Sequence, residues 1–151
     1  IMTSAKALGN GVPVGAFAAV KKFAEAMRPG DHGTTYGGNP LAAAAVCKVF
    51  EIFKEKEIPG HVQEMSFYFF GKLKSLAEKY PSVITDVRGK GLLIGLEVSY
   101  ANGEIVRKAM EKGLVLLTAG SNVVRMAPPL VIEKEQIDEC LQILDEVFSE
   151  L

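Results

Sequence analysis

The sequence predicts a chain of the α/β class that ends in an α+β unit with a mostly antiparallel sheet. Residues 40–56 and 61–80 each show the apolar spacing of a long amphipathic helix. After Pro81 the pattern changes to short apolar segments joined by glycine-containing links, which is typical of antiparallel strands. A last amphipathic segment, residues 134–151, predicts a terminal helix with one apolar face.

The chain is expected to divide near residue 57. Residues 1–56 hold few strand-like segments and are interpreted as the trailing piece of one layer, whereas residues 57–151 alternate strands and helices. A length of 151 residues suffices for one ordinary domain or for two small, mutually dependent ones. The first residue is Ile1, and we expect the chain to be part of a longer protein.

The first third is expected to contain two strands and a short helix before a long loop. Residues 1–4 predict the end of a buried strand, and the glycine-rich stretch 9–15 follows. Residues 16–20 form a compact apolar run typical of a strand, and 21–27 predict a short helix. Residues 28–38 lack an apolar period and contain five Gly or Pro residues, so we predict a loop.

Helix-capping residues, prolines and glycines predict where the remaining helices and strands begin and end. Asn39-Pro40 is typical of a helix start, with Asn as the N-cap and Pro at the first helical position, and the helix should reach about Lys56. Pro59-Gly60 is expected to break the chain before a second helix. The elements expected after it are helix 61–80, strands 83–87 and 92–98 joined by the link 88–91, helix 103–112 ended by Gly113, strands 114–117 and 123–126, and helix 134–151.

Composition excludes several functional classes. Seventeen basic and eighteen acidic residues leave a net charge of −1, which argues against a surface for nucleic acid or anionic membranes. The apolar runs are too short to cross a bilayer. Cys47 and Cys140 do not form a metal-binding pair, and two histidines are too few for a His-based metal centre. No metal is expected, and the default location is the reducing cytoplasm.

Lys6 is the first candidate for chemistry. It lies between an expected buried strand and a glycine-rich turn, and desolvation at such a place favours the neutral amine that attacks a carbonyl. The competing interpretation, favoured by the local sequence alone, is a lysine that extends from a strand end into solvent.

The loop before Asn39 is the second candidate. Thr34 and Thr35, flexible glycines and the start of a helix could gather hydrogen-bond donors around a phosphate. An ordinary capped loop explains the same residues equally well. His32 is expected to order the loop by hydrogen bonding rather than to act in catalysis.

Arg125 is the third candidate. It is a lone cation in the apolar segment Val123–Met126, where a guanidinium is costly unless an anion pairs with it. Bidentate capture of a substrate carboxylate and an internal salt bridge to a glutamate are both open interpretations.

Four ordered motifs together resemble the C-terminal part of class III, fold type I pyridoxal-phosphate aminotransferases. Met2–Ala16 resembles the cofactor-lysine motif, and His32–Ala42 resembles the phosphate loop. Val87–Leu92 and Val124–Leu130 resemble two signatures of the small domain. Within this family, Gly113–Arg125 is most similar to the acetylornithine aminotransferases of arginine biosynthesis.

The resemblance implies a fold, a cofactor and residue roles. Residues 1–56 would be the C-terminal part of the large pyridoxal-phosphate-binding domain, and 57–151 the small C-terminal α+β domain. Lys6 would be the catalytic, cofactor-bearing lysine, and Thr35 would bind the cofactor phosphate in a homodimer with a shared active site. Thr34 and Arg125 would contact substrate, Arg125 at its α-carboxylate. The parent enzyme would transfer the amino group of N-acetylornithine to 2-oxoglutarate.

The same resemblance implies that essential parts lie before the cofactor lysine. In this family the acid that pairs with the pyridinium nitrogen, the ring-stacking aromatic residue and the main phosphate loop all precede it, so we expect this chain alone to be inactive. The alternatives are ornithine, succinylornithine or 4-aminobutyrate aminotransferases of the same class. A non-catalytic dimerisation or binding module with the small-domain fold is the hypothesis from a different functional class.

Overall fold

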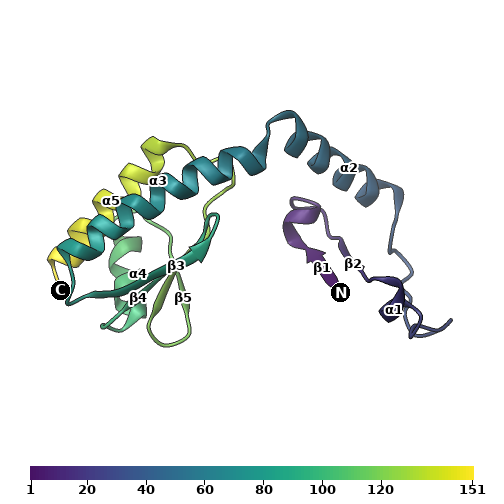
Figure 1. The fold of residues 1–151 in the computed structure, drawn as a ribbon, viewed down its shortest axis with the longest axis horizontal. Coiled ribbons are helices and arrows are strands. Elements are labelled where there is room, and N and C mark those ends of the chain that lie inside the picture. Colours follow the sequence, from purple (N-terminus) through teal and green to yellow (C-terminus); the bar gives the residue numbers. More distant parts are fainter. The chain divides into compact units, whose positions relative to one another are not determined.

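The computed structural model describes all 151 residues, and these fold as two compact units, Ile1–Glu57 and Ile58–Leu151 (Figure 1). No helix has both the length and the apolar character needed to span a bilayer. No group of three or more His, Cys, Asp or Glu side chains is arranged to hold a metal ion.

The first unit begins with a two-stranded antiparallel ribbon. Strand β1 (Met2–Ala5) pairs with β2 (Gly15–Ala18) so that Ala5 lies opposite Gly15. The 3-10 helix η1 (Lys6–Leu8) follows β1, and the short helix α1 (Lys21–Ala24) follows β2. The prediction of a buried strand at the N-terminus is wrong for this chain, because β1 is exposed apart from the half-buried Ser4. No other layer of the unit covers the ribbon.

Helix α2 (Pro40–Glu55) begins as the sequence predicts. Asn39 is its N-cap, and the Asn39 Oδ1 accepts a hydrogen bond of 3.0 Å from the backbone N–H of Ala42. The helix ends at Lys56, and Glu57 adopts a left-handed φ of +47°. The chain therefore breaks at residues 56–57 and not, as predicted, at Pro59-Gly60.

Helix α3 (Ile58–Lys79) contains Pro59 and Gly60 within its first turn. A proline is tolerated there because the first N–H groups of a helix have no partner within the helix. Met65, Phe69, Leu73 and Leu76, four of the five buried residues of α3, confirm the apolar face predicted for this helix.

The second unit contains a four-stranded sheet in which every pairing is antiparallel, as expected. The strand order is β3-β4-β6-β5, with β3 at Ile84–Lys90, β4 at Leu93–Val98, β5 at Leu117–Ala119 and β6 at Val123–Met126.

Two strand predictions need correction. Arg88–Lys90 belong to β3, and the link shrinks to a two-residue turn, Gly91-Leu92, where the φ of +58° at Gly91 suits a tight hairpin. The strand predicted at 114–117 lies instead at 117–119. The Leu114 N–H bonds to the Ala109 carbonyl at the end of a helix, so it is not available to the sheet.

Three helices cover one face of this sheet. They are α3, α4 (Asn102–Glu111) and α5 (Lys134–Ser149), and Figure 1 shows α3 and α5 side by side. The opposite face, called here the open face, carries the alternate strand residues, among them Arg88, Gly95, Glu97 and Arg125. The fully buried centre of the core consists of Phe69, Leu73, Ile94, Leu96, Val98, Ile105, Ala109, Val124, Ile137, Leu144 and Val147.

Candidate functional site

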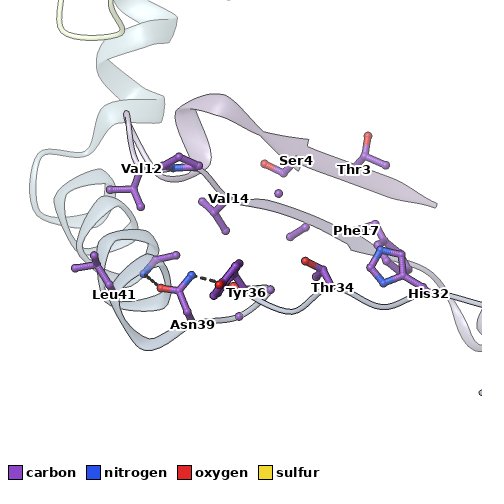
Figure 2. Close-up of a pocket in the computed structure, with 16 residues that line it drawn as sticks. Thr3, Ser4, Val12, Val14, Phe17, His32, Thr34, Tyr36, Asn39 and Leu41 are labelled. Carbon is purple, nitrogen blue, oxygen red and sulfur yellow. Dashed lines mark hydrogen bonds between the residues drawn. The ribbon is translucent and has the colours of Figure 1, made fainter. Parts of the chain in front are cut away.

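A pocket of about 960 Å³ lies within the first unit. Figure 2 shows it between the β1–β2 ribbon and the loop that leads into α2. Strand β1 contributes Thr3 and Ser4, and the loop contributes Thr34 and the Gly37-Gly38 backbone. Four hydroxyl-bearing residues, Thr3, Ser4, Thr34 and Tyr36, are thus among the lining residues, and a hydroxyl group can donate to a phosphate.

The start of α2 adds less to this pocket than the sequence suggested. Pro40 has no N–H, the Ala42 N–H bonds to Asn39 Oδ1, and the Ala43 N–H bonds to the Asn39 carbonyl at 3.0 Å. Among these first residues only the Leu41 N–H is left for a ligand. Hydroxyl groups, more than free helical N–H groups, are therefore the donors of this pocket.

Two contacts shape the loop around Thr34. The His32 ring packs edge-on against Phe17 of β2, with ring centroids 5.7 Å apart (Figure 2). His32 thus contacts the ribbon through its ring. At Gly37 a Cβ would lie 2.2 Å from Thr34 Cγ2, so the missing side chain lets the threonine lie close to the backbone.

Lys6 occupies a special backbone position two residues beyond Ser4. Its φ of +57° is left-handed, a conformation that non-glycine residues adopt rarely and that recurs at functional sites. Its side chain is exposed and does not line the pocket, so this chain does not provide the desolvation expected for it.

The turn after Lys6 explains one glycine of the motif. Gly9 is buried, and a Cβ there would lie 2.4 Å from the Val12 carbonyl oxygen. The turn closes through hydrogen bonds from the Gly9 N–H to the Lys6 carbonyl and from the Val12 N–H to the Gly9 carbonyl. The sequence motif is therefore a compact turn that presents Lys6 in its strained conformation.

The two threonines are separated by the fold of the loop. Thr34 lines the pocket together with Thr3 and Ser4, whereas the exposed Thr35 is not among the lining residues. Of the three residues predicted in the first unit, the structure places only Thr34 in the pocket.

Arg125 lies in the second unit, on the open face of the sheet. It is opposite Gly95 on β4 and Leu117 on β5, and Gly95 is in turn opposite Arg88 on β3. The neighbours Val124 and Met126 point into the core and Arg125 points to the exposed side, so the burial cost expected for its guanidinium does not arise in this chain. Sequence alternation alone could have indicated this.

Arg125 has no counter-ion within this chain, in contrast to Arg88. Arg88 Nη1 donates to Asp86 Oδ2 at 2.8 Å and to Glu97, and these carboxylates, Asp86 first, raise the pKa of Arg88. None of the ion pairs of the second unit includes Arg125. The alternative of an internal salt bridge therefore does not hold in this chain, and the guanidinium is free for an external anion.

Similar proteins have been described and solved. The chain is 46% identical over 151 residues to an acetylornithine aminotransferase of Methanocaldococcus jannaschii and 50% identical over 147 residues to one of Clostridium acetobutylicum. These alignments cover 100% and 97% of this chain but 38% of each relative. The chain thus spans well under half the length of the curated relatives it matches.

Solved structures agree with the sequence relatives. A crystal structure of acetylornithine aminotransferase from Elizabethkingia anophelis superimposes with a TM-score of 0.87 at 32% identity, over 99% of this chain and 40% of the solved chain. An ornithine δ-aminotransferase of Plasmodium falciparum gives a TM-score of 0.89 at 34% identity, over 98% of this chain and 39% of that chain. These neighbours have the fold type I architecture that the sequence predicted. The family model for class-III aminotransferases matches residues 1–148, and the chain therefore belongs to the class-III aminotransferase family.

Proposed function

We propose that the protein containing this chain is a pyridoxal-phosphate-dependent aminotransferase that transfers the amino group of N-acetylornithine to 2-oxoglutarate in arginine biosynthesis. The observation that carries the proposal is the identity of 46–50% with relatives named acetylornithine aminotransferase, over nearly the whole chain. In this proposal, residues 1–56 are the end of the large cofactor-binding domain and 57–151 are the small domain.

The residues of the first unit fit this cofactor by their chemistry. Pyridoxal phosphate carries an aldehyde and a phosphate, and the unit provides a lysine amine at a strained turn and a pocket with hydroxyl-bearing residues in its lining. When bound, the cofactor supplies the electron sink for the substrate carbanion. Thr35 is proposed to donate to the phosphate of a cofactor held mainly by a second subunit.

Lys6 is the proposed catalytic residue. Its Nζ would hold the cofactor covalently until substrate binds, and then take the proton from the substrate α-carbon as a general base. The compact turn at residues 6–12 holds the backbone of Lys6 during these changes. The cost of the left-handed backbone, on the order of 1–3 kcal/mol, is consistent with a position retained for chemistry.

Thr34 and Arg125 are the proposed substrate-binding residues. Thr34 would contact the substrate from the pocket wall, and Arg125 would bind its α-carboxylate with the planar guanidinium fork. The lack of a counter-ion at Arg125 supports this role, because no internal carboxylate has to be displaced first. Fixing the carboxylate orients the C–H bond that Lys6 must deprotonate.

This chain alone is expected to be inactive. No Asp or Glu lines the pocket of the first unit, so a carboxylate to pair with the pyridinium nitrogen must come from elsewhere in the parent protein. We propose that the parent acts as a homodimer in the cytoplasm and that both subunits contribute to each site. Transaminase turnover by the isolated 151-residue chain would contradict this assignment.

Borohydride reduction of the full-length protein with pyridoxal phosphate tests the cofactor residue. Reduction makes the lysine linkage permanent, and a peptide map then identifies the modified side chain. We expect one label per chain at Lys6, and none at Lys6 in a Lys6→Arg variant. Labels scattered over surface lysines such as Lys21 and Lys22 would refute the role of Lys6.

Ornithine aminotransferase is the second candidate function. It is favoured by the structural match to the P. falciparum enzyme at 34% identity. Steady-state kinetics of the full-length protein with N-acetylornithine and with ornithine separate the two. A larger kcat/KM for N-acetylornithine supports the first proposal, and a larger value for ornithine replaces it with the second.

A further inference from the structure

Asn102 is the one polar side chain among the buried residues of the chain, with 7% of its surface exposed. It lies at the first position of α4, and its Nδ2 donates to the Gly120 carbonyl at 3.2 Å and to the Val123 carbonyl at 3.0 Å. The side-chain amide of Asn102 therefore donates to both ends of one short segment, Gly120–Val123. This segment contains the turn between β5 and β6 and the first residue of β6.

The β5–β6 turn, residues 120–122, is held from other sides as well. The Val98 N–H donates to the Asn122 carbonyl at 2.8 Å, and Asn122 Nδ2 donates to Glu97 Oε1 at 3.2 Å. Both of these bonds come from β4, next to β6 in the sheet. Asn102 adds two further hydrogen bonds from α4, which packs on the sheet.

The turn leads directly to Arg125. Val123, whose carbonyl accepts from Asn102, is the first residue of β6, and Arg125 follows two positions later. One neighbour of Arg125 is β5, a three-residue strand at the edge of the sheet, which by itself offers little resistance to a shift. Loss of the Asn102 amide would remove both of these hydrogen bonds and with them the link between the turn and α4.

We propose that Asn102 is a positioning residue that fixes the β5–β6 turn and so orients the Arg125 guanidinium toward the substrate carboxylate. The inference rests on the proposed function of Arg125. Amino donor and keto-acid acceptor both carry the same α-carboxylate. Disturbing its binding site therefore weakens both substrates by the same factor.

Steady-state kinetics of the full-length holoenzyme test this with Asn102→Ala. We expect KM to rise roughly fivefold to tenfold for both the amino donor and 2-oxoglutarate, and kcat to fall as well, because a displaced carboxylate also misaligns the C–H bond. Asn102→Gln, which keeps an amide donor, is expected to recover part of the loss. Equal KM values in Asn102→Ala and wild type would overturn the inference.

Ile105→Val is the matched control. Ile105 lies one turn along α4 and is fully buried, but it makes no contact with the turn carbonyls through hydrogen bonds. Its truncation lowers the thermal stability of the same helix and should leave both KM values unchanged. If Ile105→Val raises KM as much as Asn102→Ala, the effect is general destabilisation and the inference fails.

A double-mutant cycle with Arg125→Lys separates the positioning role of Asn102 from the carboxylate-binding role of Arg125. If Asn102 acts through Arg125, the fold increase in KM of the double variant will be smaller than the product of the fold increases of the two single variants. If the two residues act independently, it will equal that product. Multiplying effects overturn the positioning role while leaving Arg125 as the carboxylate residue. A full-length wild-type protein without transaminase activity, or an Arg125→Lys variant with unchanged KM, refutes the proposed function itself.

Discussion

Burial determines the reactivity of Cys140. Its side chain lies in the core beside Leu144 and Ile137 on α5, and burial, followed by the nearby Glu139 charge, raises the pKa of its thiol to about 12. The neutral thiol is a poor nucleophile, because only the thiolate reacts at an appreciable rate. The cysteine therefore serves the packing of α5 and not redox chemistry.

Alkylation of Cys140 by iodoacetamide should thus depend on folding. In the native protein the raised pKa of about 12 keeps the thiolate fraction small at pH 9, whereas in denaturant the thiol ionises near its ordinary pKa of about 9. At pH 9 we expect at least tenfold slower labelling of the Cys140 peptide in the native than in the denatured protein. Equal rates, measured by peptide mass spectrometry, would contradict a buried thiol.

Gly89 is required by a close backbone approach in the β3–β4 hairpin. Its φ is +150°, and a Cβ would lie 2.1 Å from the Leu93 carbonyl oxygen and 3.0 Å from Ile94 Cα. Both obstacles are backbone atoms, so they cannot move without separating the two strands. The small-domain motif around Arg88 therefore contains a glycine for steric reasons.

Gly89→Ala is expected to destabilise the second unit by about 3 kcal/mol, from the clash and the strained backbone together. Thermal unfolding of the full-length protein measures this loss of stability as a lower melting temperature, or the variant is insoluble. Gly71→Ala is the control: Gly71 is an exposed site inside α3 where a Cβ meets nothing within 4 Å. There alanine should stabilise the helix by roughly 0.5–1 kcal/mol.

Helix termini in this chain are determined by local capping. α4 ends in a Schellman motif, in which the Gly113 N–H bonds to Met110 and the Leu114 N–H to Ala109. Gly113 has a φ of +91°, as the sequence-based assignment to C′ requires. At the start of α2, Asn39 both accepts from Ala42 and donates to the Tyr36 carbonyl at 2.9 Å.

Asn39→Ala removes the N-cap of α2 and should weaken the first turn of the helix by about 1 kcal/mol. Hydrogen exchange of the Ala42 and Ala43 amides in the full-length protein measures the loss locally, as a roughly fivefold faster exchange. Asn39→Asp keeps the acceptor oxygen and should protect these amides nearly as well as wild type. Equal exchange in Asn39→Ala and wild type would show that the cap does not hold the turn.

The two units differ in how much apolar surface each one buries. The second unit has a continuous core of buried side chains from three helices and the three strands β3, β4 and β6. In the first unit only Gly9 and Ala42 are buried, and large apolar side chains such as Phe17, Leu41 and Phe50 are exposed. Because apolar burial is the main source of stability, we propose that the first unit depends on surface supplied by the rest of the parent protein.

Hydrogen exchange of the isolated 151-residue chain should reveal this difference. Amides of β4, β6 and α5 are expected to be protected, whereas residues 1–57 should exchange at least a hundredfold faster because little buried surface opposes their opening. In the full-length protein the first unit should gain protection. Uniform protection across the isolated chain would contradict the dependence proposed here.

Much of this molecule follows from local sequence. The Asn39 cap, the Gly113 terminus and the apolar stripe of α3 are local features, because capping and helical periodicity involve residues only three or four positions apart. The lysine turn and the loop before α2 could also be located from their glycines and prolines. Locating them did not reveal which of their side chains share a pocket.

Other features depend on residues far apart in the chain. The exposure of Arg125 on the open face, the inclusion of Arg88 in β3, and the two bonds of Asn102 all depend on contacts between residues 7 to 30 positions apart in the sequence. Neither the partner of a strand nor the acceptor of a buried amide is encoded within one window of sequence, because both are chosen when distant segments pack. The sequence therefore determined the elements and the family motifs, and packing decided which side chains meet.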